Sequence, residues 1–341
     1  MQVRAGRQRA VGCVWVCAAL AALAGCSGRS CSGEGEAPLA ALEPGYRAAM
    51  ARARAWLDGL RVDPFELRAV RVKGKKKFVE QLDAYYRLWE VAPAADRPAL
   101  LERIRQVVAI TYEDRYHDMA SLGDRWFKQD STSYLRAALL MERLGLDTTR
   151  YREEIRRIHA RLDGHMKTRG PHQRRVFHWY YKHFGLAEPF PLEGSLRDGV
   201  IARRLEPTKM KDGDAYALTH EVYALYEYGE RRDIDPFDEA DKAYLRPAIE
   251  ALMRRYQVAG DPDIAGELLE CLHYLRMQDS PAYLEGVAYL LATQRPEGSW
   301  DRRAREAKPP WEYADQAFRL HTTLVAISAL TAVFERPMPP P

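Results

Sequence analysis

The amino-acid sequence predicts an all-α protein of about six helical hairpins. Apolar residues recur at spacings of three and four along twelve segments, whereas the strict alternation of a half-buried strand is hard to find. Glycine and proline breakers separate these segments, which indicates that each one is a discrete helix. The predicted helices are 46–60, 77–89, 98–112, 131–144, 151–164, 171–184, 192–203, 216–228, 236–256, 264–277, 281–294 and 317–334.

The composition excludes two broad classes of protein. The chain has 341 residues, of which 47% are apolar, and this fraction is ample for a folded core rather than a disordered chain. Its 52 Lys and Arg residues are nearly balanced by 48 Asp and Glu residues, whereas a dedicated nucleic-acid binder is usually basic throughout. We therefore expect no nucleic-acid partner. Basic clusters at 73–77 and 150–175 are interpreted as solvated helix faces, or as surfaces that rest on anionic lipid.

The first 26 residues resemble the signal peptide of a bacterial lipoprotein. Three arginines precede the apolar stretch 11–25, and Leu23-Ala24-Gly25-Cys26 matches the lipobox, in which the cysteine is acylated. The resemblance implies that residues 1–25 are removed and that Cys26 carries the lipid anchor. Ser27 in place of Asp implies the outer membrane of a Gram-negative bacterium, with the domain on the periplasmic or surface face. An ordinary secretory signal or a short uncleaved anchor is the alternative.

The rest of the chain divides into a tether, one large domain and a tail. Residues 26–38 are rich in Gly and Ser and are expected to form a flexible tether. Residues 39–335 carry all the predicted helices, and 336–341 are a proline-rich tail. No uncharged apolar run of 18 residues occurs after residue 30, so the domain is not expected to span a membrane.

A repeat in the second half of the chain predicts how the helices are arranged. The stretches 219–226, 266–273 and 321–328 can be laid over one another, and each is one helix pair from the next. Such a repeat predicts stacked helical hairpins, either as a closed ring or as an open solenoid.

One segment resembles the QW motif of the terpene cyclases. Residues 286–300 fit the pattern G-x2-(F/Y)-L-x3-Q-x3-G-x-W, with Gly286, Gln294, Gly298 and Trp300 at its fixed positions. Its physical content is a helix that ends at Gln294 and a turn that Gly298 permits. In that family the motif belongs to an α/α toroid and lies outside the cavity, so the resemblance implies a fold and no chemistry.

A second segment, 315–330, resembles the start of an inner helix in protein prenyltransferase β-subunits, where the histidine of a His-Thr pair binds zinc. The pair here is His321-Thr322. The resemblance implies an α/α toroid, in which the N-terminal ends of an inner ring of helices surround a central cavity. The reactions of both families are not implied, because the D-x-D-D and D-D-x-x-D motifs are absent and Leu269-Glu270-Cys271 stands where a D-x-C zinc motif would be.

Polar residues of the predicted inner helices form a candidate site. His220 and His321 each open one such helix, while Asp263, Glu267 and Cys271 lie at four-residue intervals on one face of a third. Two imidazoles with a thiolate or carboxylate are a plausible zinc site, and a metal-free polar cavity or ordinary helix packing are the alternatives. The predicted ligand-binding residues are His220, Glu221, Asp263, Glu267, Cys271 and His321, the possible zinc ligands are His220, Cys271 and His321, and the candidate catalytic residues are His220, Glu267 and His321.

Three functions are compatible with these features. The first is a lipid-anchored envelope protein whose cavity binds a hydrophobic or peptide-like ligand. The second is an enzyme, a hydrolase or lyase that uses the histidine, glutamate and cysteine cluster with a metal or by acid–base catalysis. The third is an open helical-repeat adaptor that holds another protein of the envelope. Apart from a possible zinc ion, the sequence predicts no cofactor.

Overall fold

The computed structural model describes residues 36–189, 198–302 and 312–339, and every regular element in them is helical, as the sequence predicts. The predicted signal peptide, Cys26 and most of the tether lie outside the described residues. None of the described helices is long and apolar enough to cross a membrane. The α-helices are α2 (Glu36–Ala40), α3 (Glu43–Gly59), α4 (Pro64–Ala69), α5 (Gly74–Val91), α6 (Arg97–Val108), α7 (Asp124–Arg143), α8 (Thr149–Arg157), α9 (His159–Met166), α10 (Pro171–Phe184), α11 (Asp212–Leu225), α12 (Glu239–Ala259), α13 (Pro262–Tyr274), α14 (Pro281–Thr293) and α15 (Glu312–Glu335). Short 3-10 helices are η1 (Ala109–Tyr112), η2 (Asp114–Tyr116), η3 (Pro207–Lys209) and η4 (Glu227–Gly229).

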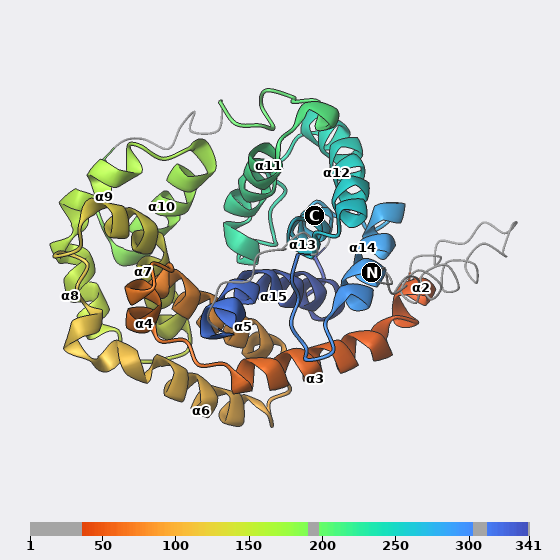
Figure 1. The fold of residues 1–341 in the computed structure, drawn as a ribbon. Helices are drawn as coiled ribbons and strands as arrows, with labels where there is room; N and C mark the ends of the chain where they lie inside the picture. The colour runs from red at the N-terminus through yellow and green to blue at the C-terminus, as the bar shows by residue number, and fades with distance from the viewer. Residues whose placement is uncertain (1–35, 190–197, 303–311, 340–341) are drawn as a thin grey trace, which may run out of the picture.

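Six helices form the inner ring of the molecule (Figure 1). Contacts run from α5 to α7, α10, α11, α13 and α15 in that order. α15 then packs extensively against α5, which closes the ring between the two ends of the domain. This closure contradicts the open solenoid, and with it the long concave groove that the adaptor hypothesis requires.

Outer helices alternate with the inner ones along the chain. The outer helices are α3, α6, α8 with α9, α12 and α14, and α14 contacts α3, so the first and last outer helices lie together. The fourth pair departs from the prediction, because residues 198–204 form turns where the sequence predicts a helix over 192–203. The N–H groups of Val200 and Ile201 donate to the Glu221 carboxylate, at 2.8 and 3.0 Å, instead of to helix carbonyls. Residues 192–197 lie outside the described part of the chain.

Several helix boundaries differ from the predicted ones. The Asp214 carboxylate accepts the N–H of Lys211 at 3.0 Å, and this cap starts α11 at Asp212. α15 begins at Glu312. The two predicted cavity histidines, His220 in α11 and His321 in α15, therefore lie about two turns inside their helices instead of in the first turn. The predicted helix 151–164 is divided into α8 and α9, and the short α4 was not predicted.

The motif that resembles the QW pattern joins the two ends of the outer layer. The Gln294 amide donates to the Ala49 carbonyl of α3 at 2.8 Å and to the Gly298 carbonyl at 3.0 Å, while Arg52 donates to its Oε1 atom at 2.9 Å. Gly298 has a φ of +104°, and a Cβ atom there would lie 2.2 Å from the Arg52 carbonyl oxygen. Only glycine fits this position, as the motif predicts.

The other two motif residues pack inside the protein. Trp300 is fully buried, and its indole N–H donates to the Leu290 carbonyl at 2.8 Å. A Cβ atom on Gly286 would lie 3.1 Å from Met253 Cε, so glycine lets α14 approach α12 closely. The motif therefore contributes to the fold and lies outside the ring.

Three buried arginines and two partly buried carboxylates pair with one another away from the first turns of the inner helices. We call Asp83, Arg87, Glu90, Arg136 and Arg336 the arginine plug. Arg136 binds Asp83 through two hydrogen bonds of 2.9 Å, and Arg87 and Arg336 lie 3.3 and 3.4 Å from Glu90. Arg336 belongs to the predicted tail, yet its side chain is buried here. Open space on the ring axis lies at the opposite end, where the inner helices begin.

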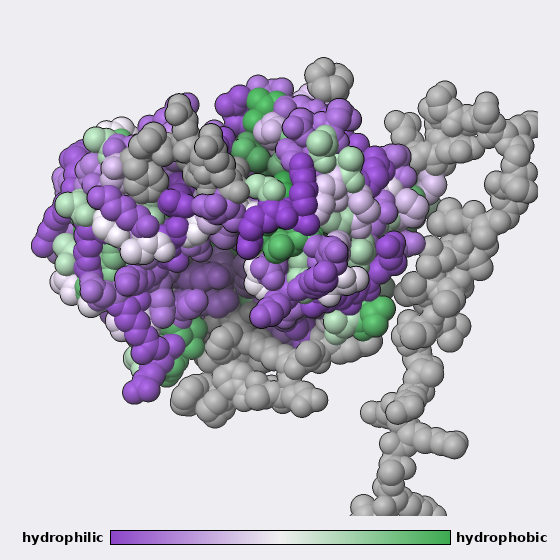
Figure 2. Space-filling view, turned by 90° about the horizontal axis from the view of Figure 1, so that it is seen from above, coloured by the Kyte–Doolittle hydropathy of each residue, from purple (hydrophilic) through white to green (hydrophobic). Residues whose placement is uncertain are grey.

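The described surface is mostly polar. Among the described residues, Tyr112 and Val258 are the only large apolar side chains that are exposed. The face seen from above is largely hydrophilic, with scattered hydrophobic residues (Figure 2). That face offers no broad apolar patch for a protein partner.

Candidate functional site

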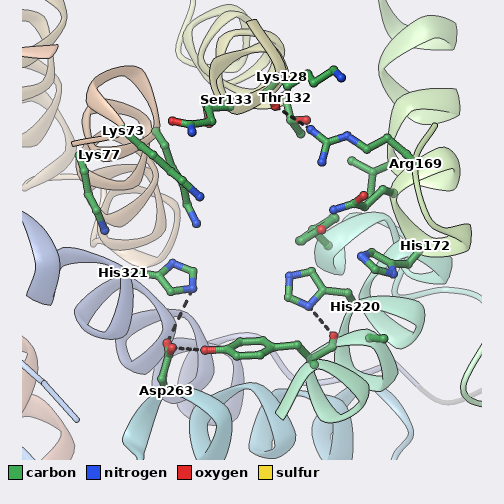
Figure 3. Close-up of a pocket in the computed structure, with 18 of the residues that line it drawn as sticks. Lys73, Lys77, Lys128, Thr132, Ser133, Arg169, His172, His220, Asp263 and His321 are labelled. Atoms are coloured by element: carbon green, nitrogen blue, oxygen red, sulfur yellow. Dashed lines mark hydrogen bonds and ion pairs between the residues drawn. The ribbon is translucent and has the colours of Figure 1, made fainter. Parts of the chain in front are cut away.

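A cavity of about 890 Å³ lies where the inner helices begin (Figure 3). All six inner helices contribute to its wall, and its volume is within the range of small-molecule sites, about 300–1,000 Å³. We call this space the ring cavity. Its lining residues are Lys73, Lys76, Lys77, Lys128, Gln129, Thr132, Ser133, Arg169, His172, Gln173, Val176, Phe177, Gly213, Tyr216, Ala217, His220, Tyr228, Asp263, Asp301, Arg302, His321 and Thr322.

Three cations in this wall have no carboxylate partner among the described residues. Lys73 precedes α5, Lys128 lies in α7 and Arg169 lies between α9 and α10; we call them the cationic rim. Arg169 donates to the Lys128 carbonyl at 2.7 Å and to His165 Nε2 at 2.9 Å, and neither acceptor is a carboxylate. Partial burial, and then the charge of Lys76, lower the pKa of Lys73.

A buried carboxylate behind the wall holds the other two lysines. Glu80 accepts a hydrogen bond from Lys77 at 2.7 Å, and it lies 3.4 Å from Lys76 and 3.1 Å from Nδ1 of His321. Burial acts to raise the pKa of Glu80, but Lys77, Lys76 and His321 together lower it well below its usual value. Glu80 therefore stays ionised and neutralises part of the positive charge of the cavity.

Asp263 connects two walls of the ring cavity. Its Oδ1 atom lies 3.7 Å from Nε2 of His321, and its Oδ2 atom accepts a hydrogen bond from the Tyr216 hydroxyl (Figure 3). The same Oδ2 atom also accepts a hydrogen bond from Arg302 at 2.6 Å. With Glu80 beside Nδ1, both ring nitrogens of His321 face carboxylates. These contacts fix the orientation of the His321 ring.

His220 and His321 lie on opposite sides of the ring cavity (Figure 3). Its Nδ1 atom donates to the Tyr216 carbonyl at 2.7 Å, so the proton of the neutral ring is on Nδ1 and Nε2 is an acceptor. The pKa of His220 is lowered to about 3 by burial and then by His172, His321 and Lys76. The His172 ring lies 5.5 Å from the His220 ring, and burial and the charge of a neighbouring arginine lower its pKa to about 4. Both imidazoles are therefore neutral at pH 7 and add no positive charge to the cavity.

A family model matches residues 46–331, and its description is Domain of unknown function (DUF6895). The chain belongs to the DUF6895 family. No curated protein and no solved structure matches the chain. The matched range contains most of the helices of both layers and all of the inner ring except the last four residues of α15. The ring cavity of this DUF6895 protein is thus part of the family domain.

Three of the predicted site residues line the ring cavity, and three do not. His220, Asp263 and His321 line it. Glu267 is buried behind His220, where it accepts a hydrogen bond from Thr219 at 2.5 Å, and burial followed by the charge of Asp263 raises its pKa well above the usual value. The candidate catalytic set of His220, Glu267 and His321 therefore has two members at the cavity and one behind it.

The remaining two predicted residues lie elsewhere in the DUF6895 domain. Cys271 is fully buried, and its thiol contacts the Thr219 carbonyl at 3.8 Å. Glu221 is buried on the outer side of α11, where it binds the turn at residues 198–204. The described residues contain no group of three or more His, Cys, Asp or Glu side chains that could hold a metal ion, so the possible zinc set is not assembled.

Sequence reasoning missed the cationic rim, His172 and Tyr228. Lys73 and Arg169 belong to the two basic clusters that the composition shows, but nothing in the sequence separates them from their solvated neighbours. Lys128 is an isolated lysine in a segment of both apolar and polar residues, and no sequence pattern indicates that it lines a cavity.

Proposed function

We propose that this DUF6895 protein is a lipid-anchored envelope protein whose ring cavity binds an anionic small molecule. The cationic rim carries the proposal, because three positive charges from separate elements border one cavity without a described carboxylate partner. Charges of one sign that line a cleft with low-dielectric walls focus the electrostatic potential and attract ions of the opposite sign. The sequence predicts a hydrophobic or peptide-like ligand, and a hydrophobic one is a poorer fit, because it would cover these charges without pairing them.

Tricarballylate, a small tricarboxylate, tests this function. Titration calorimetry with the full acylated chain in detergent is expected to give a Kd of about 1 mM or lower at low ionic strength. The Kd should rise with added NaCl, because salt screens the attraction. Glycerol has the same three-carbon skeleton without charge, and it should not bind. If tricarballylate does not bind at about 10 mM, or binds with a Kd that salt leaves unchanged, the cavity is not an anion site.

An acid–base enzyme is the second candidate, favoured by the two histidines that face the cavity from α11 and α15. His220 has an acceptor nitrogen available, as a general base requires. Its pKa of about 3 nevertheless makes it a weak base at neutral pH, and general bases act best when their pKa lies near the operating pH. Binding is therefore the better supported function.

The lipid anchor is part of the proposal and is supported by the lipobox-like residues that end at Cys26. Cys26→Ser removes the thiol that would be acylated, and two or more acyl chains hold a protein on a bilayer almost permanently. After cell fractionation we expect wild-type protein in the outer-membrane fraction and the variant in the soluble fraction. Cys31→Ser alters a nearby cysteine and should leave the protein on the membrane. Retention of Cys26→Ser on the membrane would show that the leader does not direct acylation.

A further inference from the structure

Three successive residues at the inner end of the ring cavity have left-handed backbone conformations. The φ angles are 49° at Glu227, 55° at Tyr228 and 84° at Gly229. Two of the three are not glycine, and side chains with a Cβ atom rarely adopt this region. Such strained positions persist only where the surrounding structure holds them, and they are concentrated at functional sites.

The arginine plug holds this strained turn. Arg87 donates to the Tyr228 carbonyl at 3.3 Å, and Arg336 donates to the Gly229 carbonyl at 3.1 Å. A Cβ atom on Gly229 would lie 2.5 Å from the Tyr274 hydroxyl, so the third position requires glycine. Two buried guanidinium groups thus fix a conformation that the local sequence does not favour.

The strained turn places Tyr228 between the arginine plug and the ring cavity. Tyr228 contacts Arg87 of the plug and lines the cavity. The ring is stacked on Trp179, with centroids 6.4 Å apart, and lies 5.6 Å from the ring of Tyr223. Its hydroxyl makes no hydrogen bond with any described residue. Burial raises the pKa of Tyr228, so this hydroxyl remains protonated and available as a donor.

Uncharged hydrogen-bonding groups also line the ring cavity. They are Gln129, Thr132, Ser133, Gln173 and Thr322. An acid with a long apolar chain would leave these groups without partners, and an inorganic ion would fill little of a cavity of about 890 Å³. A ligand that carries many hydroxyl groups as well as a negative charge satisfies both parts of the wall.

We propose that the ring cavity binds an acidic carbohydrate, with its negative group at the cationic rim and a hydroxylated ring against Tyr228. This inference rests on the proposed anion-binding function and adds the class of ligand. Sugar rings present apolar C–H faces that pack on aromatic side chains and hydroxyl groups that accept a phenolic proton. Tyr228 is then a specificity-determining residue, and the strain of its turn is the structural cost of placing it on the ring axis.

Trigalacturonate, an oligomer of an acidic sugar, and tricarballylate separate this inference from general anion binding. Each carries three carboxylates, but only the first has hydroxylated rings. With the full acylated chain, we expect trigalacturonate to bind at least tenfold more tightly than tricarballylate. Tyr228→Phe should weaken trigalacturonate binding about three- to tenfold, the usual effect of losing one hydrogen bond, and leave tricarballylate binding unchanged. Tyr112→Phe removes the hydroxyl of an exposed tyrosine outside the cavity and is the control.

Each outcome has a distinct meaning. Equal affinities for the two probes in wild-type protein would overturn the carbohydrate inference and leave the anion-binding function standing. The same holds if Tyr228→Phe weakens both probes equally or neither. If neither probe binds wild-type protein, the anion-binding function fails first and the inference fails with it. The comparison of probes in wild-type protein requires no variant to fold.

Discussion

Lys73→Glu combined with Lys128→Glu is expected to weaken tricarballylate binding by at least about 100-fold. Each lysine lost removes a charge-assisted contact of about 1.5–3 kcal/mol, and each glutamate adds repulsion at the same wall. Neither lysine side chain has a carboxylate partner among the described residues, so the fold should tolerate the change. Titration calorimetry at low ionic strength measures the effect, and thermal unfolding checks that the variant is folded.

A matched double variant makes this result specific. Lys182→Glu with Arg156→Glu changes the net charge by the same amount on exposed positions of α10 and α8 that do not line the ring cavity. This control should weaken binding only through the long-range field, which salt screens within about 10 Å at 0.1 M. Equal losses in the two double variants would mean that net charge, and not the cationic rim, determines binding.

Glu80→Gln is expected to lower the free energy of unfolding by about 3–5 kcal/mol, because it leaves the buried ammonium group of Lys77 without its carboxylate. Urea denaturation measures the change. Glu239→Gln removes one partner of an exposed i,i+3 pair with Lys242 and should cost no more than about 0.5 kcal/mol. If Glu80→Gln lowers the free energy of unfolding as little as the control does, the Glu80 carboxylate does not neutralise the cavity lysines.

The same carboxylate predicts how stability depends on pH. The folded-state pKa of Glu80 is lowered below its unfolded value of about 4.3, so its contribution is fully present above that value and is lost as the pH falls through the folded-state pKa. Between about pH 5 and pH 2, wild-type protein should therefore lose more stability than Glu80→Gln. Parallel losses in the two proteins would contradict the lowered pKa.

Helical periodicity predicts most of the fold, because each amphipathic helix buries one face and the residues of that face recur at regular spacings within the helix's own sequence. It fails over 198–203, the described part of the predicted helix 192–203, where a side chain from another helix, Glu221, binds backbone N–H groups and supports turns. No local pattern predicts that kind of long-range partner. The packing of α15 against α5 is likewise a long-range contact. The repeat in the second half of the chain is compatible with a closed ring and with an open solenoid, so it does not predict this contact by itself.

The candidate site was predicted in part, for a geometric reason. Asp263, Glu267 and Cys271 share a helix face, but each lies about 6 Å further along the axis than the one before. Only the first reaches a cavity at the beginning of the helix. Glu221 follows His220 directly, and neighbouring residues on a helix point about 100° apart, so both could not face the ring axis.

The basic cluster 73–77 shows why charge alone misleads. It reads as a solvated face, and this is wrong for two of its members, since Lys75 and Lys77 are buried. Lys75 donates to Asp118 at 2.5 Å, and Lys77 donates to Glu80. The neighbouring Lys73 lines the cavity. Lys73 is exposed whereas Lys75 and Lys77 are buried, and it is the position of α5 in the inner ring that determines which of these lysines meet solvent.

The proposed anion site lies inside the ring cavity, at the cationic rim. Crystals of the protein soaked in selenate, an oxyanion with strong anomalous scattering, test it most directly. We predict an anomalous difference peak within the cavity, in contact with Lys73, Lys128 or Arg169. Peaks confined to the outer surface, with none inside the cavity, would contradict the account.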